Sequence, residues 1–418
     1  MDNKFKDYKN SELGLIPTDW KIFKLSDIFD FKNGLNKEKE YFGEGYPIVN
    51  YVDVFKNRQI NGADLIGKVR VSNSEINRFN VKDGDVFFTR TSETIHEIGF
   101  SSVIINSQPN TVFSGFVLRA REKNNLLYNL YKKYCFSTHL IRKEIITKSS
   151  KTTRALTSGT LLGDVNIIVP PIAQQKKMSE IIATWDEAID LQNKLITQKK
   201  NLLSSLALSL LKNQKSLVNF QSSWTKVSLN EVFYERKEFG YEIDGLELYS
   251  LTIEDGVTAK TDRYNREFLV KGDKKKYKVT KYHDLVFNPQ NLRYGAIALN
   301  DNENPVLLSP IYVTLELKDT NKHDIEYFNF LLTSNEMIKF YDSIAEGTLI
   351  ERMTVKPEIF LKQVFSIPPI DEQRRISEVL IGLRDEINLL AKELELKKLQ
   401  KKGLMQQLLT GKIRVSVN

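Results

Sequence analysis

The chain has 418 residues, 41% of them hydrophobic and 10% aromatic, which is the composition of a folded protein too long for one core. No run of about 18 apolar residues occurs and the N-terminal segment lacks an apolar stretch, so we expect no membrane span, no signal peptide and a cytoplasmic location. The single cysteine, Cys135, excludes internal disulfides and a thiolate metal site. A net charge of +8 is compatible with a polyanionic partner but does not establish one.

A first globular segment spans residues 1–169, where short β-rich stretches are more common than long periodic ones. The stretch WKIFKLSDIF, which begins at Trp20, has the pattern of a strand that enters a short helix. In VKDGDVFFTR, which begins at Val81, a turn ending in Asp leads into an apolar strand. This mixture predicts an α/β (α+β) domain.

A polar loop, TRTSETIHEIG, follows that apolar strand. Its short polar side chains around an arginine are suited to contact DNA, and further basic residues follow before SGT at Ser158. The alternative is a turn closed by hydrogen bonds from Thr and Ser to the backbone, with the basic residues on a solvated surface. The DNA-binding candidates of this segment are Arg90, Thr91, Ser92, Lys151 and Arg154.

A long helix is predicted over residues 170–212, because neither Gly nor Pro occurs after the di-proline that opens PPIAQQKKMSE. The di-proline fixes the entry, since proline is tolerated only in the first helical turn. About 40 residues make a rod of roughly 60 Å. Apolar residues recur at every seventh position, which is the seam that two packed helices need. These residues are Ile182, Ile189, Ile196 and Leu203.

The same order is repeated in a second globular segment, residues 213–367, and in a second helical segment with the C-terminal tail, residues 368–418. WTKVSLNEVF, VTKYHDLVFN and PPIDEQRRISE match the three stretches above, although the sequences between them share almost nothing. Two unrelated amphipathic helices would not show this matched spacing. We therefore expect the two helices to pair, with Leu380, Leu383, Ile387, Leu390 and Leu394 on the second seam.

The second segment carries a different set of polar and basic residues after its apolar strand. Asn and Gln can pair with adenine and Arg with guanine at the edges of the major groove. Turn formation is again the alternative for any single residue. The candidates here are Lys274, Lys275, Lys276, Asn288, Gln290, Asn291 and Arg293.

The sequence carries no catalytic motif, and we expect a protein that is not an enzyme. GxGxxG, GxxxxGK[ST], GxSxG and HExxH are absent. Asn288 and Pro289 begin like the N-P-P-[YF] tetrapeptide of an amino-methyltransferase but lack its second proline and aromatic residue. Glu393, Glu395 and Lys397 lie inside the heptad helix, where we interpret them as a solvated charged face.

Four features together resemble the specificity subunit of a type I restriction–modification system. They are the repeated W-x-x-[FV]-x-L-x-[DE]-[IV]-F, the D-[VL]-x-F strand followed by glycine, PPIxxQxxxSE before each long helix, and the tail LLTGKIRV. The resemblance covers nearly the whole chain. One departure is the end of the first helix, LALSLLKNQ, where the second has LMQQLLTGK.

The resemblance implies two target-recognition domains, residues 1–169 and 213–367, and two spacer helices packed as an antiparallel coiled coil. Each domain would take one half of a split double-stranded DNA target, and helix length would set the gap. Two methyltransferase subunits and the restriction subunits would be the protein partners. S-adenosylmethionine, ATP and magnesium would belong to those partners, and this chain would hold no cofactor.

Two other functions are weighed against this one. A single-chain enzyme with its own methyltransferase is disfavoured by the missing tetrapeptide and by the lack of room for a catalytic domain. A coiled-coil adaptor that binds proteins instead of DNA is opposed only by the resemblance and the modest basic charge.

Overall fold

The computed structural model describes residues 7–151, 154–212, 223–241, 245–259, 276–347 and 353–417. The chain divides into two compact units: unit 1 is Met1–Gln192 with Glu393–Asn418, and unit 2 is Asn193–Lys392. Each unit contains a mixed α/β body and about half of each long helix. The predicted domain boundaries, which set each long helix apart as its own segment, stay predictions. Among the described residues, no helix is both long and apolar enough to cross a membrane.

Unit 1 is built around a five-stranded sheet in the order β4-β12-β8-β10-β6. Its strands are β4 Phe29–Asn33, β12 Val117–Glu122, β8 Val86–Thr89, β10 Ser101–Ile105 and β6 Gln59–Asn61. The central strand β8 runs antiparallel to both of its neighbours. β8 is the apolar strand predicted after the Asp turn, and all four of its residues are buried.

Alternation along β8 explains why three apolar residues, Val86, Phe87 and Phe88, follow one another there. Val86 and Phe88 belong to the core that includes the long helices, whereas Phe87 belongs to a second core on the other face. Successive side chains of a strand point to opposite faces, so a strand covered on both faces is apolar throughout. The other elements of unit 1 are β1 Tyr8–Ser11, β2 Gly14–Pro17, β3 Lys21–Lys24, α1 Leu25–Ile28, η2 Lys39–Tyr41, β5 Phe42–Val49, α2 Tyr51–Lys56, η3 Gly62–Asp64, β7 Lys68–Val69, α3 Asn73–Phe79, β9 Thr91–Ser92, η4 Ile95–Glu97, β11 Val112–Phe113, α4 Asn129–Cys135, α5 His139–Lys148, β13 Ser150–Lys151, β14 Ala155–Leu156, α6 Gly159–Gly163 and β15 Asn166–Val169.

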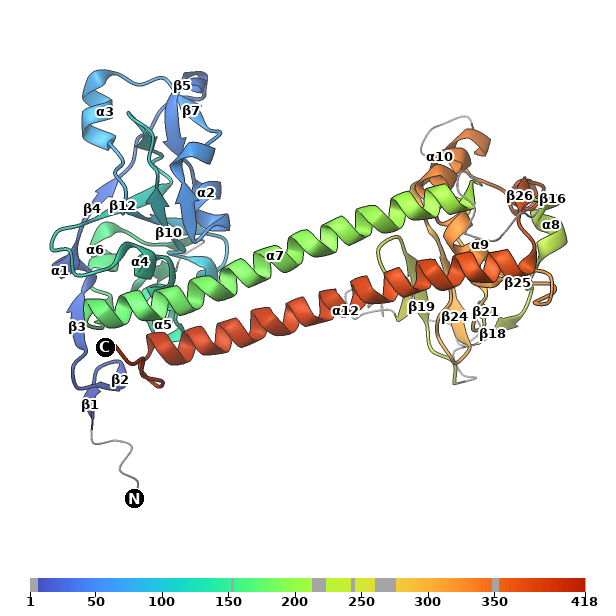
Figure 1. Cartoon of the computed structure of the whole chain (residues 1–418). Coiled ribbons are helices and arrows are strands. Elements are labelled where there is room, and N and C mark those ends of the chain that lie inside the picture. The colour runs from blue at the N-terminus through green and yellow to red at the C-terminus, as the bar shows by residue number, and fades with distance from the viewer. Residues whose placement is uncertain are drawn as a thin grey trace. The chain divides into compact units, whose positions relative to one another are not determined.

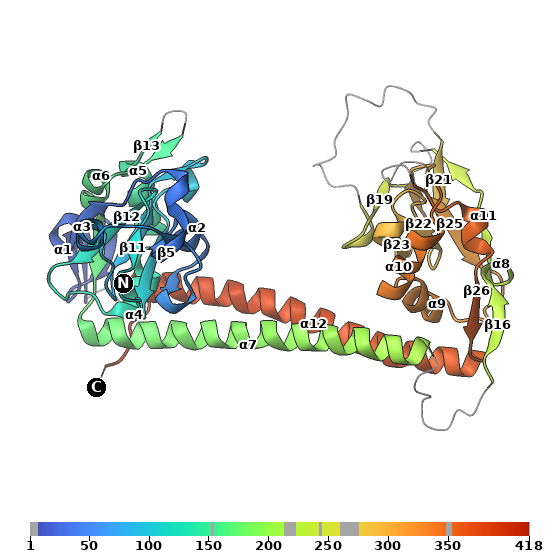
Figure 2. The same cartoon turned by 90° about the horizontal axis from the view of Figure 1, so that it is seen from above.

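Unit 2 repeats this sheet in a four-stranded form, in the order β17-β25-β22-β23. Its central strand β22, Leu285–Phe287, shows the same alternation: Leu285 and Phe287 face one core and Val286 faces another. Helices α9 and α10 lie between this sheet and the long helices (Figure 2). The elements of unit 2 are β16 Thr225–Ser228, α8 Leu229–Val232, β17 Phe233–Glu235, β18 Phe239–Gly240, β19 Tyr249–Thr252, β20 Gly256–Ala259, β21 Tyr277–Thr280, η7 Leu292–Tyr294, β23 Ile297–Leu299, β24 Val306–Leu308, β25 Val313–Leu317, α9 Ile325–Leu332, α10 Asn335–Ile344, α11 Pro357–Leu361 and β26 Val364–Ile367.

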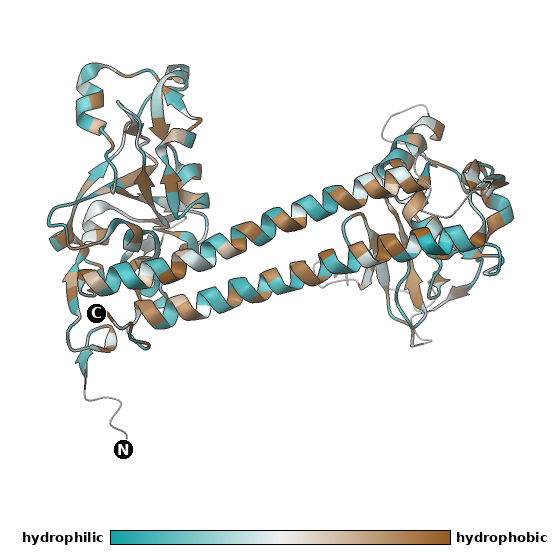
Figure 3. Ribbon diagram, in the orientation of Figure 1, coloured by the Kyte–Doolittle hydropathy of each residue, from teal (hydrophilic) through white to brown (hydrophobic). Residues whose placement is uncertain are grey.

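The two long helices are α7, Ile172–Leu211, and α12, Ile370–Leu409 (Figure 1). They run antiparallel in unit 1, because Asp186 contacts Lys401 while Gln192, further along α7, contacts Lys397, which comes earlier in α12. In unit 2, Lys199 of α7 contacts Glu386 of α12. Apolar and hydrophilic residues alternate along both helices (Figure 3). The prediction of a mixed α/β chain with two related bodies and two long antiparallel helices is confirmed. Of the predicted seam residues, Ile182, Ile196, Leu380, Ile387 and Leu394 are buried, and Ile189, Leu203, Leu383 and Leu390 are half-buried.

A polar group interrupts the apolar seam in unit 1. The Gln192 side chain, 6% exposed, accepts a hydrogen bond from Lys397 Nζ at 2.7 Å and donates to Glu393 Oε2 at 3.2 Å. The interpretation of this trio as a solvated charged face holds for Glu393 and Glu395, which are exposed, but not for the half-buried Lys397, which faces Gln192. A polar residue inside a helix seam favours one register over its alternatives.

The repeated PPIxxQ motif attaches each long helix to its α/β body. Gln175 and Gln373 are both buried, and each donates from Nε2 to the carbonyl of the first proline of its motif at 2.8 Å. The amide oxygen of Gln175 accepts from Tyr128 N at 2.8 Å, and that of Gln373 accepts from Asp324 N at 2.9 Å. A buried amide with several partners is costly to replace, which accounts for the repetition of glutamine at this place.

The LLTGK tail closes unit 1 against its N-terminal end. Gly411 has φ +75°, and a Cβ on it would lie 2.5 Å from Pro17 Cδ, so only glycine fits. Its carbonyl accepts a hydrogen bond from the Tyr8 hydroxyl at 2.8 Å. The buried Trp20 indole next to it donates to Gln174 Oε1 at 2.8 Å. The matching Trp224 of unit 2 is only half-buried, in keeping with the different ending of the first long helix.

Candidate nucleic-acid interface

The same turn precedes the central strand of both units. Asp85 Oδ2 accepts a hydrogen bond from Lys82 N at 2.8 Å, and Asp284 Oδ2 accepts one from Lys281 N at 2.7 Å. The residue before each aspartate has a positive φ, at +82° for Gly84 and at +65° for a histidine. These matched contacts give a residue-by-residue correspondence between the two units.

Each of these aspartates is buried and bound in a bidentate manner by an arginine of its own unit. Arg121 donates to Asp85 at 2.8 and 2.6 Å, and Arg236 donates to Asp284 at 2.8 and 3.1 Å. Burial raises the pKa of the Asp284 carboxyl, and the guanidinium beside it opposes that shift. The aspartate of the D-[VL]-x-F motif is therefore a structural anchor that fixes where the strand begins.

In unit 1 the predicted DNA-binding residues come together on one small sheet, β13-β14-β9. Thr91 and Ser92 pair with β14, and β14 also pairs with β13, the strand that carries Lys151. Lys151 and Arg154 are exposed, and the weak ion pair of Arg154 with Glu93 at 3.3 Å leaves both side chains in solvent.

Two of the residues in this group are held by hydrogen bonds within unit 1. Arg90 Nη1 donates to the Gly115 carbonyl at 2.9 Å. Ser92 Oγ is buried, donates to Glu97 and accepts from Thr94 N, both at 3.2 Å. For Ser92 this is the turn-forming role that the sequence left open as an alternative.

In unit 2 the structure divides the predicted residues between the turn and its exposed edge. Asn288 is buried and its Oδ1 accepts from Gln290 N at 3.0 Å. The Arg293 side chain is 9% exposed, lies 3.5 Å from Asp342 of α10 and 4.7 Å from the ring centre of the exposed Tyr294. Gln290 and Asn291 are exposed. Lys276 is exposed before β21, whereas Lys274 and Lys275 lie outside the described residues.

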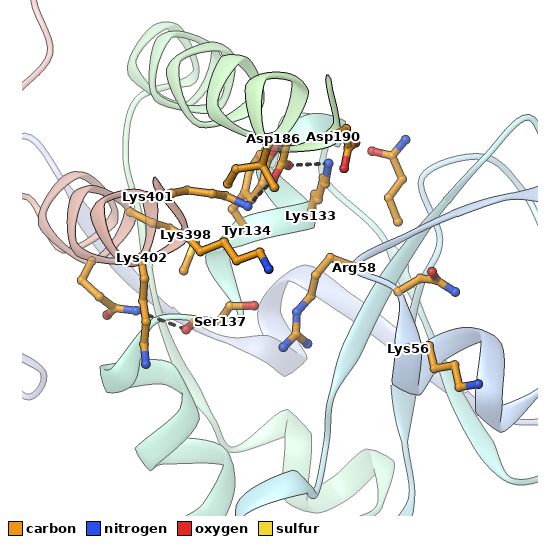
Figure 4. Close-up of a pocket in the computed structure, with 15 residues that line it drawn as sticks. Lys56, Arg58, Lys133, Tyr134, Ser137, Asp186, Asp190, Lys398, Lys401 and Lys402 are labelled. Atoms are coloured by element: carbon orange, nitrogen blue, oxygen red, sulfur yellow. Dashed lines mark hydrogen bonds and ion pairs between the residues drawn. The ribbon is translucent and has the colours of Figure 1, made fainter. Parts of the chain in front are cut away.

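A basic cleft of about 740 Å³ in unit 1 was not predicted from the sequence (Figure 4). Three of its six cations come from the run KKLQKK at residues 397–402 and the other three from distant segments, so this charge run alone does not indicate a cleft. Figure 4 shows Arg58 and Lys398 pointing toward the same space from opposite walls. The charged residues that line the cleft are Lys56, Arg58, Lys133, Lys398, Lys401 and Lys402, with Asp186 and Asp190.

Part of this charge is neutralised at the floor of the cleft. Asp186 binds Lys133 at 2.7 Å and also Lys401, and it accepts a hydrogen bond from the Tyr134 hydroxyl at 2.7 Å. Burial alone would raise the pKa of Asp186, but these three partners outweigh it and lower the pKa. Lys56, Arg58 and Lys402 remain exposed at the mouth, which makes the cleft attractive to anions.

Within the described residues, no group of three or more His, Cys, Asp or Glu side chains is arranged to hold a metal ion. The only cysteine, Cys135, is buried, and burial raises the pKa of its thiol. A buried thiol of this kind behaves as a small apolar side chain.

Known proteins resemble this chain over most of its length. The family described as "Type I restriction modification DNA specificity domain" matches residues 17–201. A putative type I restriction enzyme MjaX specificity subunit from Methanocaldococcus jannaschii is 23% identical, over 99% of this chain and 98% of its own.

Solved structures show the same fold. The S subunit of a type I restriction–modification system from M. genitalium aligns with a TM-score of 0.52 at 15% identity, over the whole of both chains. A chain from a structure on complex assembly and conformational transition of the type I R-M system aligns with a TM-score of 0.55 at 13% identity, over 95% of this chain and 99% of its own. In sequence and in fold, this chain is therefore similar to type I restriction–modification specificity subunits.

Proposed function

We propose that this chain is the DNA-specificity subunit of a type I restriction–modification complex and binds a bipartite target, one half-site to each unit. The observation that carries this proposal is that the two units share one scaffold but differ in the polar residues that follow the central strand. The Asp turn and the central strand are the same in both units. The residues that follow are Arg90 and Thr91 in one unit and Pro289 and Gln290 in the other. Two modules that recognise different sequences need this combination.

The exposed residues at these edges are the candidates for contact with bases. In unit 1 they are Lys151 and Arg154, together with the half-buried Arg90 and Thr91. In unit 2 they are Gln290, Asn291 and Lys276. Ser92, Asn288 and Arg293 are engaged within their own units, so their contribution would be to hold the edge in shape.

Contacts with the DNA backbone would come from the basic cleft of unit 1. Phosphate contacts position a protein on the duplex without carrying sequence information. The exposed cations at the cleft mouth suit that role better than base recognition, because flexible lysines make poor bidentate donors. This cleft also favours DNA over the competing function of an adaptor that binds only proteins.

The long helices would fix the distance between the two half-sites. Their antiparallel pairing and the polar contacts of Gln192 favour one register, and a fixed register gives a fixed gap. Adding four residues to a long helix, about one turn, should change the gap and leave both half-sites unchanged.

The chain itself would be non-catalytic and would act in the cytoplasm. Two methyltransferase subunits would dock on it, and restriction subunits would join for cleavage. S-adenosylmethionine, ATP and magnesium would be bound by those partners.

Methylation mapping tests this proposal directly. The chain is expressed with its neighbouring methyltransferase, and modified bases are mapped across the host genome. A split motif with two defined halves and a constant gap is the expected result. Continuous or absent methylation, with the methyltransferase active on another specificity subunit, would favour the adaptor.

A further inference from the structure

A short turn at the start of a sheet strand has the same geometry in both units. In unit 1 it is Ser114–Val117, where Val117 N donates to the Ser114 carbonyl at 3.1 Å. In unit 2 it is Ser309–Tyr312, where Tyr312 N donates to the Ser309 carbonyl at 3.1 Å. Each turn leads into the strand that pairs with the central strand, β12 in unit 1 and β25 in unit 2.

The strand registers show that the third residues of the two turns are equivalent. Val86 and Leu285 both follow the matched aspartate, and they pair with Ala120 and Leu315. Counting back from these two partners places Phe116 of unit 1 at the position of Ile311 of unit 2. The serines that close the two turns fall into correspondence by the same count.

Both of these equivalent residues are large, apolar and exposed. The exposed fraction is 68% for Phe116 and 56% for Ile311, whereas Leu118 and Val313, two residues further on, are buried. A single exposed apolar residue needs no explanation. Here, however, two exposed apolar residues occupy equivalent positions in units that share almost no loop sequence. Because neither side chain contributes to a core, we take this to indicate a function that both units share.

The two turns lie beside the edges assigned to base contact. Arg90 N donates to the Phe116 carbonyl at 3.4 Å, and the Arg90 guanidinium donates to Gly115. In unit 2, Val313 pairs with Phe287, the residue that precedes Asn288. An apolar side chain at such an edge would face the same groove as the polar residues next to it.

We infer that Phe116 and Ile311 each contact the 5-methyl group of a thymine, one in each half-site. The thymine methyl is the apolar feature that base pairs present in the major groove, and phenyl and aliphatic side chains pack against it. Phosphates and polar base edges offer such side chains no favourable contact. This inference rests on the proposed function and names the chemistry of one contact in each half-site.

The test uses the target found by methylation mapping and the full chain, with its methyltransferase subunits where these are needed for binding. Each thymine of the first half-site is replaced in turn by deoxyuridine, which removes only the methyl group. With the wild-type chain, one replacement should weaken binding about three- to fivefold, the effect of returning one methyl group to water. Phe116→Ala should weaken binding to the thymine duplex and should make that replacement neutral.

Ile311→Ala should behave in the same way at the second half-site and leave the first unaffected. Leu15→Ala and Val364→Ala, which truncate exposed apolar residues elsewhere in units 1 and 2, are the matched controls and should bind as the wild type does.

Several results would overturn the inference while the proposed function stands. They are a half-site without any T·A pair, variants that bind like the wild type, or equal deoxyuridine effects in wild type and variant. Weaker binding by Phe116→Ala without any deoxyuridine effect would also overturn it, and would indicate insertion between base steps. Failure of the proposed function looks different, because the wild-type chain would then show no half-site preference at all.

Discussion

The two places where a long helix meets its α/β body use opposite charges at matching positions. In unit 1, Asp186 of α7 accepts a hydrogen bond from the Tyr134 hydroxyl. In unit 2 the corresponding residue of α12 is Arg384, which lies 5.4 Å from the ring centre of Phe330 and 3.2 Å from Glu326. Phe330 of unit 2 stands at the position of Tyr134 of unit 1, as the matched contacts of Tyr128 and Asp324 show. Unit 2 therefore has no tyrosine hydroxyl at this place, and it has a guanidinium where unit 1 has a carboxylate.

This contrast separates two kinds of residue in a duplicated fold. Positions that bind the backbone, such as the buried Gln175 and Gln373, keep their identity because a carbonyl and an N–H are present whatever the sequence. Positions that bind another side chain, such as Asp186 and Arg384, are free to change once their partner changes. Residues of the first kind maintain the contacts that both units share, and residues of the second kind differ between the units.

The largest expected effect tests whether the Asp turn contributes equally to the stability of both units. Asp85→Ala and Asp284→Ala each leave an arginine without its buried partner, so each should destabilise its own unit by about 3–5 kcal/mol. Urea unfolding of the full chain measures this change. Asp30→Ala, which removes an exposed carboxylate, should change stability by less than about 0.5 kcal/mol. An effect confined to one unit would contradict the equivalence.

A smaller effect is expected at the tail that closes unit 1. Gly411→Ala places a methyl group against Pro17 and strains a residue at positive φ, which should cost about 1–3 kcal/mol. Gly403→Ala is the matched control, because that glycine lies in α12 with open space around it. The control should stabilise the chain by up to about 1 kcal/mol, since alanine favours the helix. Equal behaviour of the two variants in urea would show that the tail does not close unit 1.

The repeats and periodicities of the sequence predicted two related α/β bodies and two long helices, and the family resemblance supplied the antiparallel pairing of those helices. The Asp turn, the apolar strand and the glutamine motif all express local or backbone contacts, which a sequence carries directly. The long helices were predicted for the same reason, because their seams have a period that can be counted.

The candidate site could be predicted only in part, since it depends on which distant segments meet. The sequence pointed to Arg90, but not to its bond with Gly115. It placed Lys397 in solvent because nothing local indicated that Gln192 faces it across the seam. The basic cleft could not be predicted either, because it forms only where distant segments of the chain meet.

The cleft offers a way to separate backbone contacts from base contacts. Replacing Lys56, Arg58 and Lys402 together by alanine should weaken DNA binding about tenfold on every sequence, target or not. The slope of log affinity against log salt should become shallower by about 0.9 for each phosphate that the variant no longer neutralises. Fluorescence anisotropy over a range of salt concentrations measures both quantities. Lys362→Ala, at an exposed lysine of unit 2, is the control, and an effect limited to the target sequence would assign the cleft to base recognition.

The smallest expected effect is a pH dependence of stability, which Asp186 contributes in unit 1. Its partners lower the pKa of this carboxyl below the ordinary 3.8, so the ionised form is stabilised by folding. The stabilisation is fully present above pH 3.8 and is lost as the pH falls through the lower pKa of the folded state. Asp186→Asn should therefore cost about 1 kcal/mol at neutral pH, and the difference from the wild type should shrink toward pH 3.

Urea unfolding at a series of pH values between 7 and 3 follows this difference. Asp190→Asn, an exposed carboxylate one helical turn away on the same cleft, should stay within about 0.5 kcal/mol of the wild type throughout. A deficit in Asp186→Asn that is the same at every pH would mean that shape and not charge holds the helix here. In that case the exchange of Asp186 for Arg384 between the two units would reflect packing around Tyr134 and Phe330, because the charge itself would contribute nothing.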